Sequence, residues 1–249
     1  MSIIIKSERE IALMRRAGKI VAVVLELLTK RLRPGMKTRE LDVIAIREIE
    51  RLGAKPSFLG YRGFPASLCV SVNDEIVHGI PGKRVLCEGD IVSCDLGAVF
   101  EGFQGDAAVT VGLGEISPQA GALIETTREA LNAAISVACS GARLGDISAA
   151  VQNYVESRGY TVVREYTGHG IGREMHEEPQ IPNFGVPGSG PVLRKGMALA
   201  LEPMVNAGDW RTRLADDQWA VLTTDGSLSA HFEHTIAIGD GKAEVLTAL

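Results

Sequence analysis

The chain has 249 residues and a formal net charge of -5, with 45% hydrophobic and 23% charged residues. These values are typical of a globular protein with a sizeable core and give no reason to expect nucleic-acid binding. No apolar stretch approaches the roughly 20 residues that span a bilayer. The N-terminal SIII run is too short for a secretory signal. We therefore expect a cytoplasmic protein with no membrane or nucleic-acid partner.

Helices open the chain and strands follow them. Ser7 and Glu10 form a capping box, which predicts a helix over about residues 7–32. A second helix is predicted over residues 38–52, before a glycine that suits a helix end. Strands are then predicted at the β-branched runs SLCVSV, EIVHG, DIVSCDLGAVF and DAAVTVGL.

Three of the four cysteines, at positions 69, 87 and 94, fall in this region, and Cys139 falls near the end of the next predicted helix. They show no CxxC spacing, so the sequence indicates neither a zinc knuckle nor a disulfide framework. Free thiols in a reducing compartment are the expected state.

The second part of the chain has the same order of elements. Ser117 and Pro118 predict the start of a helix that reaches about Ser140, and another helix is predicted over residues 146–158. Strands are then predicted at YTVV, MALALEP, WAVLTT and HFEHTIAI.

These two parts align as an internal repeat. Glycines bracket the second and fourth predicted helices at the same spacing, and EGDIVSCD, ending at Asp95, aligns with RKGMALALE, ending at Glu202. A run of matches in register predicts two copies of one unit. We expect a single α/β (α+β) domain over residues 1–249, with pseudo-two-fold halves at about 7–112 and 117–240.

Four acids and a histidine are candidate metal ligands. Asp95 and Glu202 each close an apolar run, so we expect them at equivalent strand ends, facing each other across the pseudo-two-fold axis. Facing buried carboxylates repel and require protons or a cation. Asp106 and Glu233 lie in largely apolar runs that predict buried strands, where an unpaired charge is costly. With His169 they form a hard, oxygen-rich set that suits divalent Mn, Fe or Co, and that can hold two ions roughly 3.5–4 Å apart.

The stretch GHGIGREMH places His169 and His176 seven positions apart among three glycines. Each glycine costs roughly 1 kcal/mol relative to alanine inside a helix. The stretch therefore reads as a loop or strand, unlike the helical histidine pair of an H-E-x-x-H zinc site. On the residues alone, His176 and His78 are more readily interpreted as hydrogen-bonded strand histidines than as functional groups.

The motifs SVNDEIVHGIP, CDLGAVFEGFQGD, YTGHGIGREMHEEP, ALEPMV and FEHT occur in the order and spacing of methionine aminopeptidases of type I. The resemblance covers essentially the whole chain and implies the pita-bread fold, in agreement with the internal repeat. It also implies metal-dependent removal of the N-terminal methionine from nascent proteins whose second residue is small. With neither a zinc-binding extension nor a type II helical insertion, the chain resembles the short bacterial form.

The resemblance assigns the metal ligands their roles. Asp106 and Glu233 would bridge two divalent ions, Asp95 would complete one site, and His169 with Glu202 would complete the other. The ions would be Co, Mn or Fe(II), with Zn as a further option. Glu202 would also act as the general base toward the attacking water.

The resemblance further assigns the substrate site. His176 would donate a hydrogen bond to the developing oxyanion, and His78 would orient the peptide beyond the cleaved bond. Gly97 stands where a threonine often supports the metal site, which puts that contact in doubt. The residues that contact substrate would be Phe58, Tyr61, Phe64, Cys69, His78, Met175, His176 and Trp219. Phe58, Phe64 and Met175 depart from the familiar residues, but all are apolar and suit a thioether.

Two alternatives share this fold. An Xaa-Pro aminopeptidase has the same ligand set but usually carries an additional N-terminal domain, for which there is no room before Ser7. A non-enzymatic pita-bread binding protein typically lacks metal ligands, whereas all five are present here. For the aminopeptidase, the expected partners are the N-terminal peptides of nascent proteins and the ribosome, and the expected state is a monomer.

Overall fold

The structure is a computed structural model that describes residues 2–249. Its helices are α1 (Glu8–Arg31), α2 (Thr38–Arg51), α3 (Pro118–Val137) and α4 (Leu144–Glu156), with a short 3-10 turn η1 (Tyr61–Gly63). Its strands are β1 (Lys55–Pro56), β2 (Cys69–Val72), β3 (Glu75–Val77), β4 (Ile91–Phe100), β5 (Phe103–Gly112), β6 (Thr161–Val162), β7 (Thr167–Gly170), β8 (Glu177–Pro182), β9 (Ala198–Leu201), β10 (Met204–Asn206), β11 (Thr212–Leu214), β12 (Val221–Thr223), β13 (Ser229–His231), β14 (Glu233–Ala237) and β15 (Glu244–Val245).

The helix starts follow from their caps. Ser7 and Glu10 form the predicted capping box of α1, and Ser117 caps α3 through the amide of Ala120. The prediction for α4 is wrong by two residues at each end. The Asp146 carboxylate accepts the backbone N–H of Arg143, so this acid is the third residue of the helix rather than its first.

The predicted end of α3 at Ser140 is also wrong, because the helix stops at Val137. Ala138 leaves the helical conformation and Cys139 pairs with Lys242 in an isolated β-bridge. The short strands β1, β8, β10, β11 and β15 have no counterpart among the predicted strands. Each has six residues or fewer, too little for a hydrophobic period to emerge, and β8 contains two prolines.

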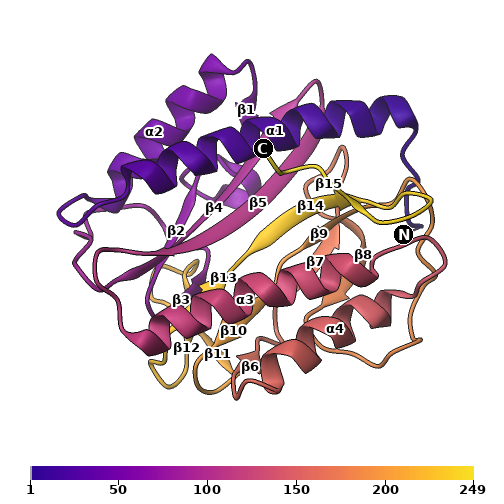
Figure 1. Cartoon of the computed structure of the whole chain (residues 1–249). Helices are drawn as coiled ribbons and strands as arrows, with labels where there is room; N and C mark the ends of the chain where they lie inside the picture. The colour runs from indigo at the N-terminus through magenta and orange to yellow at the C-terminus, as the bar shows by residue number, and fades with distance from the viewer. Residues whose placement is uncertain (1) are drawn as a thin grey trace.

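A nine-stranded sheet forms the centre of the molecule. Its main path runs β1-β4-β5-β14-β9-β7-β8, with β2 paired to β4 and β15 paired to β14. Two three-stranded sheets, β13-β10-β6 and β11-β12-β3, adjoin it. All pairs are antiparallel. The helices α1 and α3 lie across one face of the large sheet (Figure 1).

Side-chain alternation along β4 leaves one face of the sheet free for chemistry. The even-numbered residues of 92–98 pack in one core with α1 and α2. Asp95 and Gly97 therefore point to the opposite face, because successive side chains of a strand alternate. In the second half, Leu199 and Leu201 of β9 pack in a separate core with α3 and α4. Each half thus has its own helix-covered core, whereas the half-repeat boundaries stay a prediction.

The prediction that Asp95 closes its strand is wrong. β4 continues to Phe100 and turns into β5 through Glu101 and Gly102, whose φ angles are 48° and 78°. Two consecutive positive φ angles are typical of the type I′ turn that joins a tight hairpin. Asp95 therefore lies in the middle of a long strand, whereas Glu202 directly follows β9 as predicted.

The expectation for the cysteines is met. The four cysteines of the chain are all unpaired. Among residues 2–249, no helix combines the length and apolar character that crossing a membrane requires.

Candidate metal centre and peptide-binding cavity

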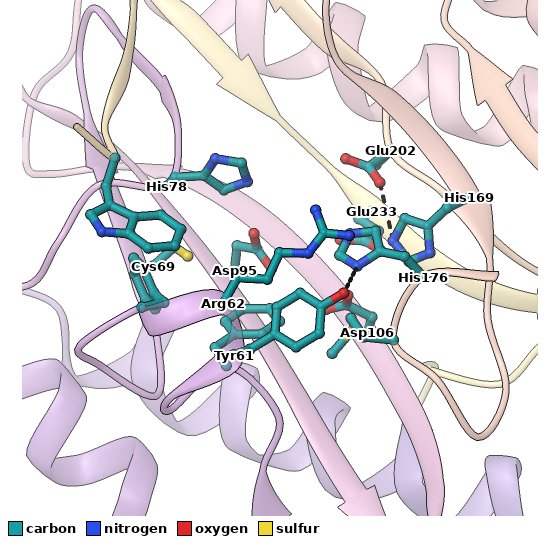
Figure 2. A pocket seen from close by; sticks show the side chains of 14 residues that line it. Tyr61, Arg62, Cys69, His78, Asp95, Asp106, His169, His176, Glu202 and Glu233 are labelled. Atoms are coloured by element: carbon teal, nitrogen blue, oxygen red, sulfur yellow. Dashed lines mark hydrogen bonds and ion pairs between the residues drawn. The ribbon is translucent and has the colours of Figure 1, made fainter. Parts of the chain in front are cut away.

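One cavity of about 160 Å³ opens on the face of β4 and β5 that points away from α1 (Figure 2). It brings together all thirteen site residues predicted from the sequence, and Arg62 in addition. The lining residues are Phe58, Tyr61, Arg62, Phe64, Cys69, His78, Asp95, Asp106, His169, Met175, His176, Glu202, Trp219 and Glu233. Their individual roles stay predictions.

Five strands that lie next to one another supply the five predicted ligands. In sheet order these strands are β4, β5, β14, β9 and β7. Each strand carries one of the predicted ligands, except that Glu202 directly follows β9. In the same order the residues are Asp95, Asp106, Glu233, Glu202 and His169. The strand order therefore gathers side chains that are far apart in the sequence along one line across the sheet.

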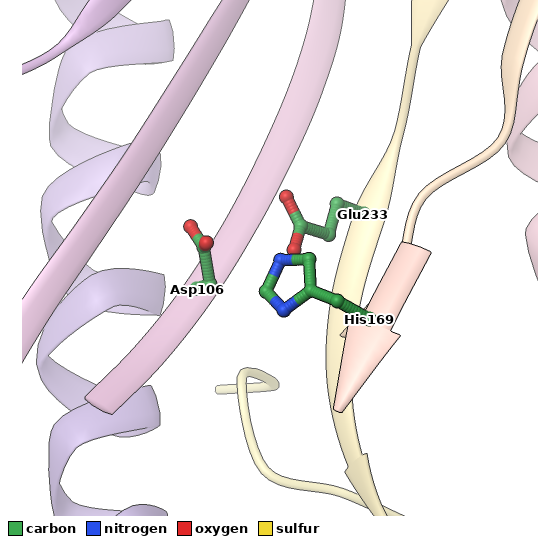
Figure 3. Close-up of side chains that lie close together, drawn as sticks. All are labelled: Asp106, His169 and Glu233. Atoms are coloured by element: carbon green, nitrogen blue, oxygen red, sulfur yellow. The ribbon is translucent and has the colours of Figure 1, made fainter. Parts of the chain in front are cut away.

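Asp106, His169 and Glu233 form the tightest part of this cluster (Figure 3). One ligand atom from each lies within 4.8 Å of the other two. Glu202 adjoins them, with its Oε1 3.5 Å from His169 Nε2. Asp95 pairs across the hairpin with Ala108, two residues along β5 from Asp106.

The carboxyl groups are buried and close to one another. Burial raises the pKa of Asp106 to about 7. Burial, together with the neighbouring Asp106, raises the pKa of Asp95 well above its usual range. The pKa values of Glu202 and Glu233 are raised in the same way by burial and by the other acids. Four ionised carboxylates cannot share such a site unless a positive charge balances them.

The donor set fits divalent cations. Asp95 Oδ1, Asp106 Oδ1 and Glu233 Oε1 are buried and have no hydrogen-bond partner among residues 2–249. Unpartnered buried oxygens of this kind are costly unless a ligand binds them. A set of carboxylate oxygens with one imidazole nitrogen suits a hard or borderline divalent metal.

His169 presents a free nitrogen to this cluster. Its Nδ1 lies 2.9 Å from the carbonyl oxygen of Gly170, which can only accept a hydrogen bond. Nδ1 therefore carries the proton, and Nε2 has its lone pair available. Burial lowers the pKa of His169 to about 4, so the ring is neutral near pH 7.

His176 has a different environment, although its ring centroid is only 4.2 Å from that of His169. The chain leaves β7 at Gly170, so His176 lies in the following loop rather than on the strand. Its Nδ1 is 2.8 Å from the hydroxyl of Tyr61, and the two rings are stacked. Burial, and then the neighbouring His169, lower the pKa of His176 to about 3.

His78 follows the end of β3 and has a φ of 61°. This left-handed conformation is uncommon outside glycine and turns the side chain away from the direction the strand would give it. The ring lies edge-on to Tyr166 at 5.8 Å and lines the cavity. Neither His78 nor His176 is therefore a strand histidine, and that interpretation of the sequence is wrong.

Three residues near the site have no counterpart in the sequence prediction. Arg62 lines the cavity mouth, and His231 Nε2 lies 4.0 Å from Glu202 Oε2. The Thr235 hydroxyl accepts the Asp106 N–H at 3.0 Å and donates to the Asp106 carbonyl at 2.8 Å. The two-residue period of HFEHT places His231 and Thr235 on the same face as Glu233, a signal that identifies both.

Comparison with known proteins places this site in a family. Residues 12–240 match the family model of metallopeptidase family M24. The chain is 54% identical to a methionine aminopeptidase of Clostridium acetobutylicum, over 98% of each chain. It is 53% identical to methionine aminopeptidase 1 of Bacillus subtilis, over 98% of this chain and 99% of that one. The chain belongs to family M24, among the methionine aminopeptidases.

Solved structures agree with this assignment. A crystal structure of methionine aminopeptidase from Thermotoga maritima superposes with a TM-score of 0.98 and 51% identity over the full length of both chains. A prolidase from Pyrococcus furiosus has a TM-score of 0.82 at 22% identity, which shows a shared fold alone. The predicted pita-bread fold is thus confirmed.

The same comparisons distinguish the two peptidase alternatives. An Xaa-Pro dipeptidase from Bacillus anthracis is 25% identical, and this chain covers 61% of its length. The methionine aminopeptidases match end to end at about twice that identity. The Xaa-Pro alternative is therefore disfavoured, as the sequence predicts.

Proposed function

We propose that this M24 metallopeptidase removes the N-terminal methionine of nascent proteins in the cytoplasm, using two divalent cations. The observation that carries the proposal is the row of five ligands on five adjacent strands, beside an apolar pocket. Unpaired cysteines agree with a reducing compartment. The substrates are peptides with a free amino terminus and a small second residue.

The ligand set divides between two ions. Asp106 and Glu233 would bind both, Asp95 would complete one site, and His169 Nε2 with Glu202 would complete the other. Mn, Fe(II) and Co suit these donors, and Zn is a further option. When bound, such cations polarise the scissile carbonyl and acidify a water molecule.

Glu202 is the proposed proton carrier. Its carboxylate directly follows β9, and its buried environment favours the protonated form, which raises its pKa. Ionised beside bound cations, this carboxylate would accept a proton from the attacking water and return it to the amine that leaves. His231 Nε2 lies 4.0 Å from Glu202 Oε2, beyond hydrogen-bond range.

His176 is the proposed donor to the oxyanion. Its low pKa keeps the ring neutral, so one nitrogen accepts a hydrogen bond and the other donates one. We assign the Tyr61 hydroxyl as the donor to Nδ1, which leaves Nε2–H to hydrogen-bond the scissile carbonyl oxygen. A donor held in place this way stabilises negative charge that develops during attack. His78 would orient the peptide beyond the cleaved bond.

An apolar pocket next to the carboxylates would receive the methionine side chain. Phe64 and Trp219 pack edge to face at 5.2 Å, and Cys69 and Phe58 adjoin them. Met175 also lines the cavity. A flexible, unbranched thioether fits such a surface. Crowding near His78 and the metal centre would restrict the second residue to small side chains.

The test is hydrolysis of a Met-Xaa-Ser peptide series, with Xaa running from Gly to Phe, by protein reconstituted with Mn, Fe(II) or Co. We expect cleavage when Xaa is Gly, Ala or Ser, and a steep fall in kcat/KM as Xaa becomes bulky, because a large group displaces the scissile bond. An Ala-Pro-Ser peptide is the control for Xaa-Pro activity. Equal kcat/KM across the series, or preference for the control peptide, would contradict the proposal.

A further inference from the structure

Gly97 lies in the interior of β4 although its backbone does not require glycine. Its φ is outside the positive range, unlike that of many other glycines in this chain. Glycine inside a strand costs roughly 0.5–1 kcal/mol relative to alanine. Gly97 pairs with Asp106 and points to the same face as Asp95, toward the cavity. The reason for a glycine here therefore lies in the space beside it.

That space is already filled by side chains of the substrate pocket. A Cβ on Gly97 would lie 2.8 Å from the Cβ of Ser57 and 2.9 Å from both Met175 Cε and Phe58 Cε1. Non-bonded contacts this short are essentially never seen for a Cβ atom, so a neighbour would have to move. Phe58 and Met175 both line the cavity. The missing side chain of Gly97 gives these two residues the room that they occupy.

The neighbours of Gly97 differ in how freely they can move. Ser57 is held firmly, because its N–H donates to the Gly97 carbonyl at 3.0 Å and its hydroxyl donates to Gln104 Oε1 at 2.6 Å. The Met175 methyl is the end of a flexible side chain, and the Phe58 ring borders the open cavity. A side chain at position 97 would therefore displace Met175 and Phe58 into the cavity.

We propose that Gly97 sets the depth of the methionine side-chain pocket by letting Met175 and Phe58 withdraw from it. The inference rests on the proposed function and adds a specificity-determining residue that does not itself touch the substrate. With a larger residue at position 97, the pocket becomes shallower. The variant then loses less activity on peptides whose first side chain is shorter than on peptides that begin with methionine.

The test compares Met-Ala-Ser with norvaline-Ala-Ser, whose first side chain is shorter, for wild type and Gly97→Ala. We expect the ratio of kcat/KM values, methionine over norvaline, to fall at least about 10-fold, the scale on which apolar pockets discriminate one group. Bound metal per chain is measured in parallel and should be unchanged. Gly241→Ala is the matched control, because a Cβ there meets nothing within 4 Å.

A compensating variant separates pocket depth from general damage. Truncating Met175 in the double variant Gly97→Ala/Met175→Ala should restore the ratio toward wild type, since the displaced methyl is gone. If Gly97→Ala does not fold, the double variant is compared with Met175→Ala, which deepens the pocket and should raise kcat/KM for ethionine-Ala-Ser relative to Met-Ala-Ser. The added Cβ at position 97 should reverse part of that rise, and identical preferences of the two variants would overturn the inference.

The outcomes are distinct. An unchanged methionine-to-norvaline ratio in folded Gly97→Ala would overturn the inference. An equal loss on both peptides with loss of metal would also overturn it, because position 97 would then act on the carboxylates. Failure of metal-loaded wild type to cleave Met-Ala-Ser would refute the proposed function itself.

Discussion

His169 and His176 show how two identical side chains in one glycine-rich stretch acquire different properties. His169 lies on β7 and donates from Nδ1 to a backbone carbonyl, which leaves Nε2 free to bind a cation. His176 lies beyond the strand, and its Nδ1 is occupied by the Tyr61 hydroxyl. Both rings are neutral near pH 7 because burial lowers their pKa values to about 4 and about 3.

Replacing His176 by alanine should leave metal binding intact and lower kcat by roughly 10²–10³, the usual scale for one oxyanion donor. The reason is that only the hydrogen bond to the developing charge is lost. Tyr61→Phe is the matched variant and should have a smaller effect, because it removes the orienting hydroxyl but keeps the donor. Steady-state kinetics and metal analysis check both variants. Loss of metal from His176→Ala would mean that both histidines are ligands.

Replacing Asp106 by asparagine should abolish activity and lower the bound metal per chain. Asp106 lies in the tightest part of the cluster and has an unpartnered buried oxygen. An amide binds a cation more weakly than a carboxylate does and brings no negative charge. Asp74→Asn, a carboxylate outside the cavity, serves as the control and should keep full metal content. Normal metal stoichiometry and turnover in Asp106→Asn would exclude the assigned centre.

At the scale of elements, close contact between α1 and β5 fixes the sheet behind the proposed metal ligands. A Cβ on Gly105, the residue before Asp106, would lie 2.6 Å from the backbone nitrogen of Gly18 in α1. A Cβ on Gly18 would lie 2.3 Å from the carbonyl oxygen of Leu246. Two glycines thus allow the helix, the strand and the C-terminal segment to pack backbone against backbone.

Gly18→Ala should therefore destabilise the protein by about 1–3 kcal/mol, as overpacking does. This result opposes helix propensity, which favours alanine over glycine by roughly 1 kcal/mol. Gly121→Ala in α3 is the matched control, because its nearest neighbour would be Ile116 Cδ1 at 3.9 Å. We expect that control to be neutral or stabilising. Urea unfolding at fixed metal content measures both changes, and equal stabilisation would contradict the packing argument.

On the scale of the whole molecule, the two halves meet at a cluster of like charges. Each half packs its strands on its own pair of helices, and the two hydrophobic cores are separate. The carboxylates Asp95 and Asp106 come from one half, and Glu202 and Glu233 come from the other. Their mutual repulsion opposes the association of the halves when no cation is bound.

Asp106→Asn should therefore stabilise the metal-free protein in a pH-dependent way. Because the folded pKa of Asp106 is raised to about 7 from 3.8, the folded state binds more protons than the unfolded state between these values. The contribution of Asp106 to stability thus falls as pH rises through this window. Asparagine does not titrate, so the variant should match wild type near pH 4. At pH 8 the free energy of unfolding of the variant should exceed that of wild type by about 2–4 kcal/mol, which corresponds to roughly 5–10 °C in Tm.

Thermal unfolding of both proteins after metal removal checks this expectation. Asp106 also raises the pKa values of Asp95, Glu202 and Glu233, so its removal relieves these groups as well and adds to the difference in the same direction. Saturating metal should reverse the order, since binding to the folded state stabilises wild type more than the variant. If the Tm difference between the variant and wild type is the same at pH 4 and at pH 8, the pKa of Asp106 is not raised in the folded protein.

The sequence by itself determined the features that depend on neighbouring residues. The capping box of Ser7 and Glu10, and the cap at Ser117, set where α1 and α3 begin, because these hydrogen bonds form within one turn. The alternating direction of successive side chains along β4 and β5 determined which of them share one face of the sheet. Motif resemblance supplied the family and thirteen of the fourteen residues that line the cavity.

Only the tertiary structure decided how those residues meet. Strand order depends on which segments pair, and the hydrophobic periodicity of one segment does not specify its partner. In this protein the order places β14 between β5 and β9. It brings Asp106 and Glu233 together and sets His231 beside Glu202. The space beside Gly97 is likewise defined by Phe58 and Met175, which come from distant loops. Sequence periodicity describes one segment at a time, whereas burial, pKa and pocket depth arise from several segments packed together.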